Sequence, residues 1–336
     1  MKNKISVVIA TYNGERFIQK EIETILNQTI PADEVILGDD GSSDNTKTII
    51  KKFIVENDLE NWILIENETN LGLSKNFFNI LSKATGDFIF IADQDDEWEL
   101  DKIEKMIKVM ENDSKIMCLT SSFDIIDENS AKIDPPKGLT EIESLNDESF
   151  KVTYTNELIG HSKLRGCMMC VRRDLISIIL KTDLPNALSM DLLCHDWAIS
   201  IVATIIGQCV NYNKILCHYR VHGSNTSLEN LNRFKMKRKI SRRINGLEKS
   251  IDAHLELLKL NNLNIELSST LKNKMIKHVK FEEKRVFFLK NPSLLKYLSL
   301  IINVQNYSCY YSSFYQGIKV LIGDLIYVLE SRGKSQ

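Results

Sequence analysis

The stretch from Gly86 to Trp98, GDFIFIADQDDEW, constrains the fold of this chain most, because a short apolar run stops abruptly at a group of acids. Phe88–Ala92 is predicted to be a buried strand, since aromatic and β-branched residues follow one another without polar alternation. Asp93, Asp95 and Asp96 then stand at its carboxyl end, where ligands of open α/β sheets bind. A helix N-cap accounts for one aspartate, but three acids that repel one another are typical of a cation site. We therefore expect this strand end to hold a metal ion and a diphosphate.

Three similar strands precede this one, and each ends in a turn that leads into a helix. They are expected at Ile5–Ala10, Glu34–Gly38 and Ile63–Glu66. Alternating strands and helices predict a parallel, doubly wound α/β sheet. Asp40 follows the second strand, so its carboxylate is expected on the same rim as the acids of the fourth strand. Lys75 lies at the start of the helix after the third strand, where backbone N–H groups favour an anion.

After the acids, the pattern becomes more varied. We expect a helix over 99–111, a strand over 115–121, a long polar excursion over 124–157, a strand over 165–171, a helix opening at residue 195, and two short strands ending at Arg220 and His222. A loop as long as the excursion tends to be functional or mobile. From residue 227 the strand signals cease, and apolar residues recur at helical spacing. The chain is therefore predicted to consist of one α/β domain over 1–226 and a helical domain over 227–336.

The size and charge of the chain exclude some classes of protein. With 336 residues it can bury a full hydrophobic core. Its 43 basic and 45 acidic residues give a net charge of -2, which argues against nucleic-acid binding. The seven cysteines, an odd number and mostly in apolar runs, are typical of reduced, buried thiols. The apolar run near the N-terminus is too short for a signal peptide, so we expect a cytoplasmic protein.

The C-terminal part combines basic and apolar segments. Arg233–Arg243 carries seven basic residues in eleven positions. Leu294–Val304 and Phe314–Leu329 are apolar, but each is too short to span a bilayer. This composition is expected of an anchor that lies on the anionic inner face of the cell membrane. A solvated helix face explains the basic run equally well, and both interpretations stay open.

Several binding motifs are missing from the sequence. A single glycine, Gly14, lies in the turn after the first strand, so neither a dinucleotide-binding fingerprint nor a Walker loop is present. Cys167 and Cys170 form a C-x-x-C motif, which raises the question of a zinc site. These two cysteines are expected on opposite faces of one strand, however, and a closed zinc site needs four ligands on turns. Dehydrogenases, P-loop enzymes and structural zinc at these cysteines are therefore disfavoured.

Six motifs, taken together and in order, resemble those of one enzyme family. They are SVVIATYNGERFIQKEIETILNQT, DEVILGDDGSSDNT, NLGLSKNF, GDFIFIADQDDEW, HDW and YRVHGSN, and they cover roughly residues 4–225. They look like the motifs of the family 2 inverting glycosyltransferases, and ADQDDEW with HDW most resembles the bacterial rhamnosyltransferase branch. The resemblance implies a GT-A nucleotide-sugar fold, with a mostly parallel sheet flanked by helices. The C-terminal third carries no motif of this family.

The resemblance also implies which residues bind the nucleotide. Thr11 and Tyr12 are expected to pack on the base, and Asp40 to accept a hydrogen bond from the pyrimidine ring. Lys75 is expected near the diphosphate.

A second group of residues is implied for the metal and the diphosphate. Asp93 and Asp95 form the D-x-D motif of the family, which holds the ribose and a divalent cation, Mg²⁺ or Mn²⁺, that bridges the two phosphates. His222 is expected to join them as a metal ligand. Arg220 or His222 is expected to close over the diphosphate from the far side.

The resemblance places the chemistry at the HDW motif. Asp196 occupies the position of the catalytic base, which removes the proton of the acceptor hydroxyl as it attacks. The wider family more often has Glu-Asp here, so His195 departs from it but fits the rhamnosyltransferase branch. Trp197 and His195 are expected at the acceptor, where Trp197 could stack on a sugar ring. Ordinary helix packing is the alternative role for Trp197.

The donor and acceptor are less constrained than the reaction. dTDP-rhamnose is the leading donor on resemblance alone, and UDP-glucose or UDP-galactose is the alternative. A lipid-linked intermediate of surface polysaccharide, such as O-antigen or capsule, suits the basic and apolar C-terminal part as an acceptor. A non-catalytic relative that binds nucleotide sugar or glycan would show a damaged D-x-D or a missing base, and neither is seen. A nucleotidyltransferase needs a Gly-rich first loop, which TYNGERF does not supply. Homo-oligomer formation is left open.

Overall fold

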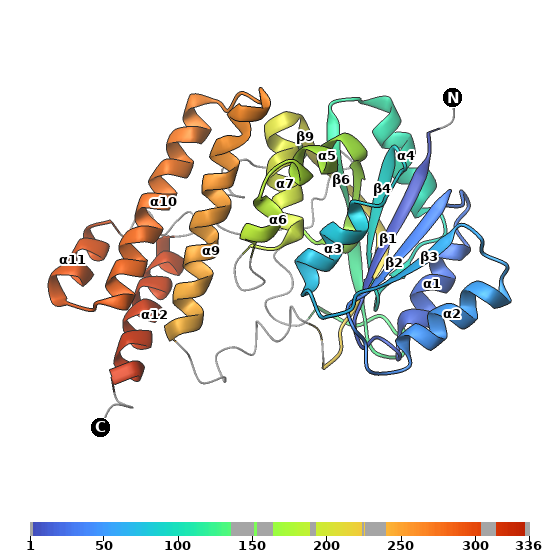
Figure 1. The fold of residues 1–336 in the computed structure, drawn as a ribbon, viewed down its shortest axis with the longest axis horizontal. Coiled ribbons are helices and arrows are strands. Elements are labelled where there is room, and N and C mark those ends of the chain that lie inside the picture. Colours follow the sequence, from blue (N-terminus) through green and yellow to red (C-terminus); the bar gives the residue numbers. More distant parts are fainter. Residues whose placement is uncertain are drawn as a thin grey trace.

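The computed structural model describes residues 3–135, 151–152, 164–188, 193–223, 225, 240–303 and 314–332. Within these residues a single mixed sheet lies beside a group of C-terminal helices (Figure 1). The strands are β1 (Ile5–Thr11), β2 (Glu34–Asp39), β3 (Trp62–Glu66), β4 (Phe88–Asp93), β5 (Glu97–Trp98), β6 (Ile116–Ile126), β7 (Lys151–Val152), β8 (Met169–Arg172) and β9 (Gln208–Arg220). They are hydrogen-bonded in the order β3-β2-β1-β4-β8-β6-β9-β5, and β7 pairs with β9.

The first four strands form a parallel half-sheet, as the sequence predicts. β1 lies between β2 and β4 and pairs in parallel with both. Every residue of β1 and β2 is buried, because helices cover both faces of the sheet. The register aligns the strand ends, since Thr11 lies opposite Asp39 and Ala10 lies opposite Asp93. The carboxyl ends of these strands therefore meet at one rim, where the acids were expected.

The second half of the sheet corrects three expectations. The strand predicted over 165–171 is a 3-10 turn, η1 (Gly166–Met168), followed by β8, which is antiparallel to β4. The two short strands expected near Arg220 are one long strand, β9. Its register against β6 shifts at Ser121 and Ser122, so the polar residues between Tyr212 and Ile215 form an irregularity within the strand rather than a break. β6 also continues to Ile126, into the predicted excursion, whose residues 136–150 and 153–157 lie outside the described residues.

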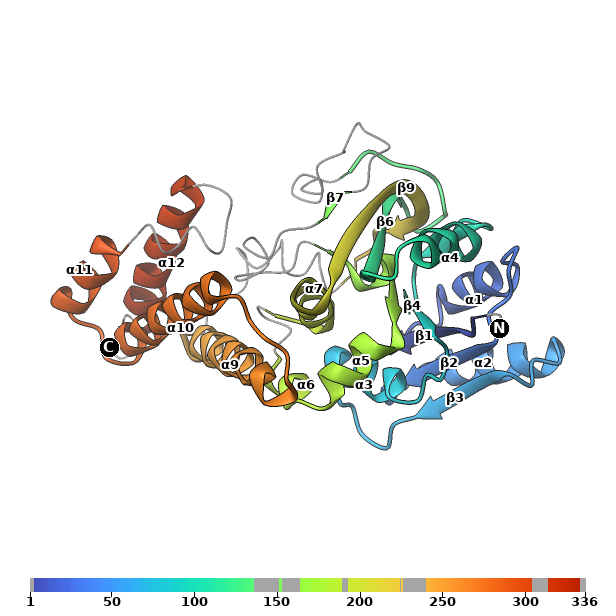
Figure 2. The same cartoon turned by 90° about the horizontal axis from the view of Figure 1, so that it is seen from above.

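Helices cover both faces of the sheet (Figure 2). They are α1 (Ile18–Leu26), α2 (Thr46–Glu56), α3 (Leu73–Leu81), α4 (Lys102–Asn112), α5 (Arg173–Leu180), α6 (Leu184–Ala187) and α7 (His195–Ile206). Val7 and Ile9 of β1 share a core with α1, α2 and α4, whereas Val8 and Ala10 share a core with α3, α5 and α7. Because side chains point to alternate faces along a strand, β1 contributes residues to two hydrophobic layers, one on each face of the sheet.

The C-terminal part is helical, in agreement with its apolar spacing. Its helices are α9 (Ile240–Leu258), η2 (Lys259–Leu263), α10 (Ser269–Lys290), α11 (Leu294–Ile302) and α12 (Phe314–Arg332). Ala253 of α9 and Met275 of α10 join the same core as α7, and Arg285 of α10 forms a buried ion pair with Asp324 of α12. None of the described helices combines the length and apolar composition that crossing a bilayer demands. The domain boundary proposed at residue 226 falls outside the described residues and stays a prediction.

Candidate functional site

The carboxyl end of β4 carries the acids that the sequence singles out. Ligand atoms of Asp93, Asp96 and Cys167 all lie within 4.8 Å of one another. Burial, followed by the charge of Asp95, raises the pKa of Asp96 to about 7. Burial, followed by the charges of Asp95 and Asp96, also raises the pKa of Asp93 well above its ordinary value. The acids therefore disfavour one another's ionisation, and a cation beside them would offset this effect.

Asp95 contacts a different element, the segment that follows β9. Its Oδ2 atom lies 2.8 Å from His222 Nε2 and 3.3 Å from Asn225 Nδ2. The exposed fractions of the Asp95 and His222 side chains are 16% and 5%. At this distance the two groups are hydrogen-bonded to each other, and a carboxylate and an imidazole are both residue types that bind a divalent cation. The mixture of oxygen and nitrogen suits Mn²⁺ better than Mg²⁺, which prefers oxygen ligands alone.

Asp196 lies in the first turn of α7, near the β4 acids. Cys194 Sγ and Trp197 N donate hydrogen bonds to its Oδ1 atom at 2.9 and 2.6 Å. These two donors fix the orientation of the carboxylate. After burial and the two neighbouring aspartates, the charge of Asp196 adds to the raised pKa of Asp93. The structure thus brings Asp196 within electrostatic reach of the D-x-D motif, and its role as a base stays a prediction.

His195 and Trp197 point into the core rather than toward solvent. The His195 ring stacks on Phe77 with centroids 4.0 Å apart, and burial lowers its pKa. Gly166 makes room for this ring, since an added Cβ there would lie 2.5 Å from His195 Nε2. Trp197 has 0% of its surface exposed and lies against His254. A buried ring cannot stack on a sugar, so this arrangement argues against an acceptor contact by either side chain and favours the packing role for Trp197.

The loop after β1 is tied to the D-x-D motif by the residue between its aspartates. Gln94 Oε1 accepts a hydrogen bond from Tyr12 N at 2.8 Å, and Gln94 Nε2 donates one to Tyr12 O at 3.1 Å. Gly14 leaves room for this side chain, since a Cβ there would lie 2.2 Å from Gln94 Oε1 and the amide would have to move. Tyr12 is 49% exposed and can meet a base, whereas Thr11 is buried in β1 and hydrogen-bonds to Gly38 and Asp39.

Asp40 and Lys75 lie at the next part of the rim. The Asp40 carboxylate accepts hydrogen bonds from Leu71 N and Gly72 N, at 2.7 and 2.8 Å, and from Asn67 Nδ2. Asp40 therefore holds the turn that leads into α3, whatever else it contacts. Lys75 is exposed in the first turn of that helix, where an anion can approach it.

The side chain of Arg220, which was expected over the diphosphate, is directed into the protein. Its side chain is 2% exposed, and its guanidinium donates hydrogen bonds to the carbonyls of Asp95 and Asp127 and forms an ion pair with Glu97. Its backbone N–H donates to Asp96 Oδ1 at 3.0 Å. All three guanidinium nitrogens thus bind the protein itself, so the arrangement argues against a phosphate contact. His222, two residues later, is the member of this pair that reaches Asp95 of the D-x-D motif.

Two charged residues beneath the acids were not anticipated. Glu21 of α1 is fully buried, and burial followed by the charge of Asp96 raises its pKa well above the ordinary value. Lys102 of α4 is also fully buried; its Nζ donates a hydrogen bond to Cys167 O at 2.8 Å and lies 3.8 Å from the centre of the Trp98 ring. Both occupy apolar helix faces, and that is the signal in the sequence that could have revealed them. Lys102 thus places a cation near Glu21 and Asp96, and its charge lowers the pKa of both acids.

The chain resembles known glycosyltransferases in sequence. Residues 6–176, just over half of the chain, match the model of the family described as glycosyl transferase family 2. An uncharacterized glycosyltransferase of Nostoc sp. is 26% identical over 226 residues, which are 67% of this chain and 67% of that protein. The GalNAc(5)-diNAcBac-PP-undecaprenol beta-1,3-glucosyltransferase of Campylobacter jejuni is 35% identical over 94 residues, 28% of this chain and 30% of that protein. The chain thus spans less than a third of the Campylobacter enzyme.

Solved structures show the same fold. TarS 1-349 of S. aureus superposes with a TM-score of 0.58 at 17% identity, over 99% of this chain and 92% of TarS. The mannosyltransferase PcManGT of Pyrobaculum calidifontis, in complex with GDP-Man and Mn2+, superposes with a TM-score of 0.55 at 14% identity, over 98% of this chain and 88% of that one. The predicted GT-A fold is therefore confirmed, while the rhamnosyltransferase branch stays a prediction. The family model covers β1 to β4 and the acids Asp93, Asp95 and Asp96 that follow, and the chain belongs to glycosyl transferase family 2.

Proposed function

We propose that this protein is an inverting glycosyltransferase that moves a sugar from a nucleoside diphosphate sugar to a hydroxyl group of a glycan acceptor. One observation carries the proposal. His222 Nε2 lies 2.8 Å from Asp95 Oδ2 on the rim that also holds Asp93, and the charge of Asp196 is close enough to raise the pKa of Asp93. A binding module without catalytic function has no need for a carboxylate such as Asp196 beside the D-x-D motif. The geometry thus favours an enzyme over its non-catalytic alternative.

The donor is proposed to bind along the rim from β2 to β4. Tyr12, exposed at the end of β1, would face the base, and Lys75 would face the phosphates from α3. Asp95 and His222 would hold a divalent cation, with Asp93 beside them. When bound, the cation supplies positive charge to the diphosphate as it leaves. The nitrogen ligand from His222 favours Mn²⁺ in this role.

Asp196 is proposed to be the base. Its carboxylate takes the proton of the acceptor hydroxyl as that oxygen bonds to the anomeric carbon, and the bond from this carbon to the diphosphate breaks on the opposite face. The anomeric centre is inverted as a result. General base catalysis of this kind contributes about a hundredfold to ten-thousandfold, or roughly 3 to 5 kcal/mol.

We infer a role in bacterial polysaccharide synthesis from the names of two relatives. The Campylobacter protein is named for an undecaprenol-linked acceptor, and a chondroitin synthase of Pasteurella multocida is 27% identical over 228 residues, 68% of this chain and 22% of that protein. dTDP-rhamnose remains the proposed donor on the motifs ADQDDEW and HDW. UDP-glucose or UDP-galactose is the alternative, and a complex of TarS with UDP-GlcNAc supports the wider class of nucleotide-sugar donors.

The test is a release assay with the purified chain. Free nucleoside diphosphate is measured across a panel of nucleotide sugars, with Mn²⁺, with Mg²⁺ and with EDTA. We expect one donor to be preferred, Asp196→Asn to lower turnover about a hundredfold or more while donor affinity stays unchanged, and EDTA to stop the reaction. Asp174→Asn, at an exposed site in the first turn of α5, is the matched control. Turnover by Asp196→Asn at the control's rate would contradict the assignment of the base.

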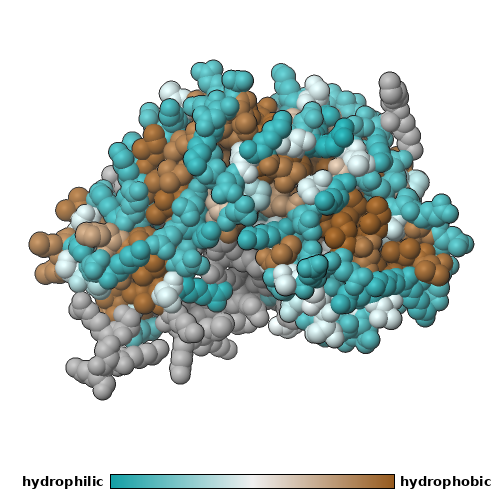
Figure 3. Space-filling view, viewed as in Figure 1, coloured by the Kyte–Doolittle hydropathy of each residue, from teal (hydrophilic) through white to brown (hydrophobic). Residues whose placement is uncertain are grey.

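We also propose that α11 rests on the cytoplasmic surface of an anionic membrane. Leu294, Leu295 and Ile302 of this helix are 73%, 80% and 79% exposed. The space-filling view shows apolar side chains gathered at the end of the molecule where α11 lies (Figure 3). Lys296 lies among them, with its Nζ 3.7 Å from the centre of the Phe287 ring. An apolar helix face with lysine at its edge is the composition of an interfacial helix.

Co-sedimentation with lipid vesicles tests this surface. The full chain should bind vesicles that contain phosphatidylglycerol more than vesicles of phosphatidylcholine alone, and salt should weaken the binding. Leu295→Glu should abolish binding, and Val55→Glu, at an equally exposed site on α2, should not. Equal binding by Leu295→Glu, or a stable dimer in solution that this variant dissociates, would contradict the proposal.

A further inference from the structure

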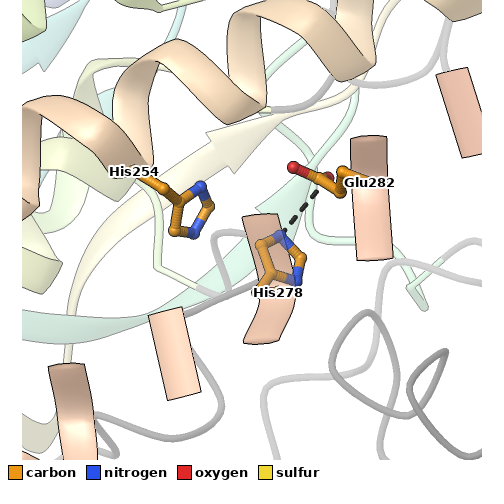
Figure 4. Close-up of side chains that lie close together, drawn as sticks. All are labelled: His254, His278 and Glu282. Atoms are coloured by element: carbon orange, nitrogen blue, oxygen red, sulfur yellow. Dashed lines mark ion pairs between the residues drawn. The ribbon is translucent and has the colours of Figure 1, made fainter. Parts of the chain in front are cut away.

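Three buried side chains converge between α9 and α10, which lie side by side. His254 belongs to α9, and His278 and Glu282 lie one turn apart on α10. Each offers a ligand atom, and these atoms lie within 4.8 Å of one another. Both imidazole rings and the carboxylate face a common space (Figure 4). All three residues are at least 96% buried. They belong to α9 and α10 and not to the strand ends that carry the D-x-D motif, so they form a separate cluster.

The spacing within the cluster matches that of a metal site. His278 Nε2 lies 3.3 Å from Glu282 Oε1. Two ligands bound about 2.0–2.1 Å from a tetrahedral zinc ion are about 3.3 Å apart. The four-residue spacing of His278 and Glu282 places both on one helix face, and His254 approaches from the facing helix. Two imidazoles and one carboxylate are a ligand set of zinc sites, which is completed by a fourth ligand such as water.

Neighbouring hydrogen bonds orient these groups as they do in metal sites. His254 Nδ1 donates a hydrogen bond to Ser250 O at 2.7 Å, so the neutral ring carries its lone pair on Nε2. Ser250 Oγ donates to Glu282 Oε1 at 2.9 Å. Metal-binding histidines commonly donate their second N–H to a backbone carbonyl, which fixes the tautomer and the ring orientation. Ser250 thus positions one ligand on each helix.

We propose that His254, His278 and Glu282 bind a divalent transition-metal ion, with zinc as the ion that best suits their nitrogen and oxygen atoms. The ion joins α9 to α10. The His254 ring lies 5.3 Å from that of Trp197, so the site also supports the helix that carries Asp196. This metal site is independent of the cation at Asp95 and does not depend on the proposed sugar transfer.

Metal analysis of the full chain tests the proposal. The protein is loaded with zinc, separated from free metal and measured by mass spectrometry. Wild type and Asp95→Asn should both retain about one zinc per chain. Cobalt should give the visible absorption of a four-coordinate site in both proteins. A wild-type chain without retained zinc and without this cobalt spectrum overturns the proposal, and so does loss of all zinc in Asp95→Asn.

Variants within the cluster locate the metal. Glu282→Gln keeps the size of the side chain but removes its charge, and Glu283→Gln changes the exposed neighbouring residue. We expect zinc to be lost from Glu282→Gln and retained by Glu283→Gln, and zinc to raise the melting temperature only when it is retained. Full zinc content in Glu282→Gln refutes the site. If Glu282→Gln does not fold, the wild-type metal content and cobalt spectrum still decide.

Discussion

Lys102→Met tests whether a buried cation stabilises the acid cluster. Lys102 has no exposed surface, and its Nζ donates a hydrogen bond to Cys167 O at 2.8 Å over the Trp98 ring. Its charge lowers the pKa of Glu21 and of Asp96, against larger effects of burial. Methionine has a similar length and no charge, so the substitution removes the cation and leaves little cavity.

The expected loss follows from these contacts. A hydrogen bond from a charged donor contributes about 1.5–3 kcal/mol. A desolvated cation over an aromatic face contributes about 2 kcal/mol. Together these two contacts contribute about 3.5–5 kcal/mol, and both are lost with the ammonium group. We expect a loss in this range, a large fraction of the stability of an ordinary domain.

Urea unfolding in EDTA at neutral pH, followed by circular dichroism, measures this loss. Lys105→Met is the control, because Lys105 lies on the same helix but forms an exposed pair with Asp101. The control should lose about 0.5 kcal/mol or less. A loss below about 1 kcal/mol in Lys102→Met would show that the acids do not depend on this cation.

Three further substitutions test other parts of the site. Gly14→Ala should displace Gln94 and weaken nucleoside diphosphate binding, measured by calorimetry, by about tenfold or more. The control Gly223→Ala, whose added Cβ meets no atom within 4 Å, should bind the nucleotide as wild type does. Glu21 has a raised pKa in the folded protein, so its contribution to stability is complete below about pH 4.5 and falls as the pH rises. The free energy of unfolding of Glu21→Gln, measured in urea, should therefore rise relative to that of wild type as the pH increases. A difference between the two proteins that does not change with pH would contradict this. Hydrogen bonds from neighbouring residues outweigh burial and lower the pKa of Glu34, so Glu34→Gln should lose about 1–2 kcal/mol at pH 7, and this difference should shrink as the pH falls below about 4.5. Equal pH profiles for Glu34→Gln and wild type would refute that reasoning.

The parallel half of the fold could be predicted because its signals are local. Unbroken apolar runs such as Ile5–Thr11 arise only where both faces of a strand are covered, and turn residues follow each run. The second half was less predictable, because β9 keeps polar residues within a continuous strand by shifting its register against β6. Such an irregularity depends on the partner strand and leaves no clear pattern in the sequence of one strand.

The direction in which a side chain points is the feature of this site that the sequence predicts least well. HDW and YRVHGSN were assigned to the site, but burial divides each motif. Asp196 lies at the edge of the core, whereas Trp197 lies wholly within it. His222 reaches Asp95, whereas Arg220 is held by backbone carbonyls and Glu97. Motif membership indicates the region of a residue, but only packing decides whether its polar atoms face a ligand or the protein.

The four residues from Asp93 to Asp96 show how one short segment organises several elements. Asp93 lies with Cys167 below the rim, and Gln94 holds both the N–H and the carbonyl of Tyr12. Asp95 binds His222, and Asp96 accepts the backbone N–H of Arg220. Each residue therefore fixes a different part of the site. In order, these parts are the acid cluster, the loop that would face the base, the proposed metal ligand His222, and the end of β9 just before that ligand. Because successive side chains at the end of a strand point in different directions, four consecutive polar residues reach all of these neighbours, and the order of residues within ADQDD specifies the geometry of the site as well as its charge.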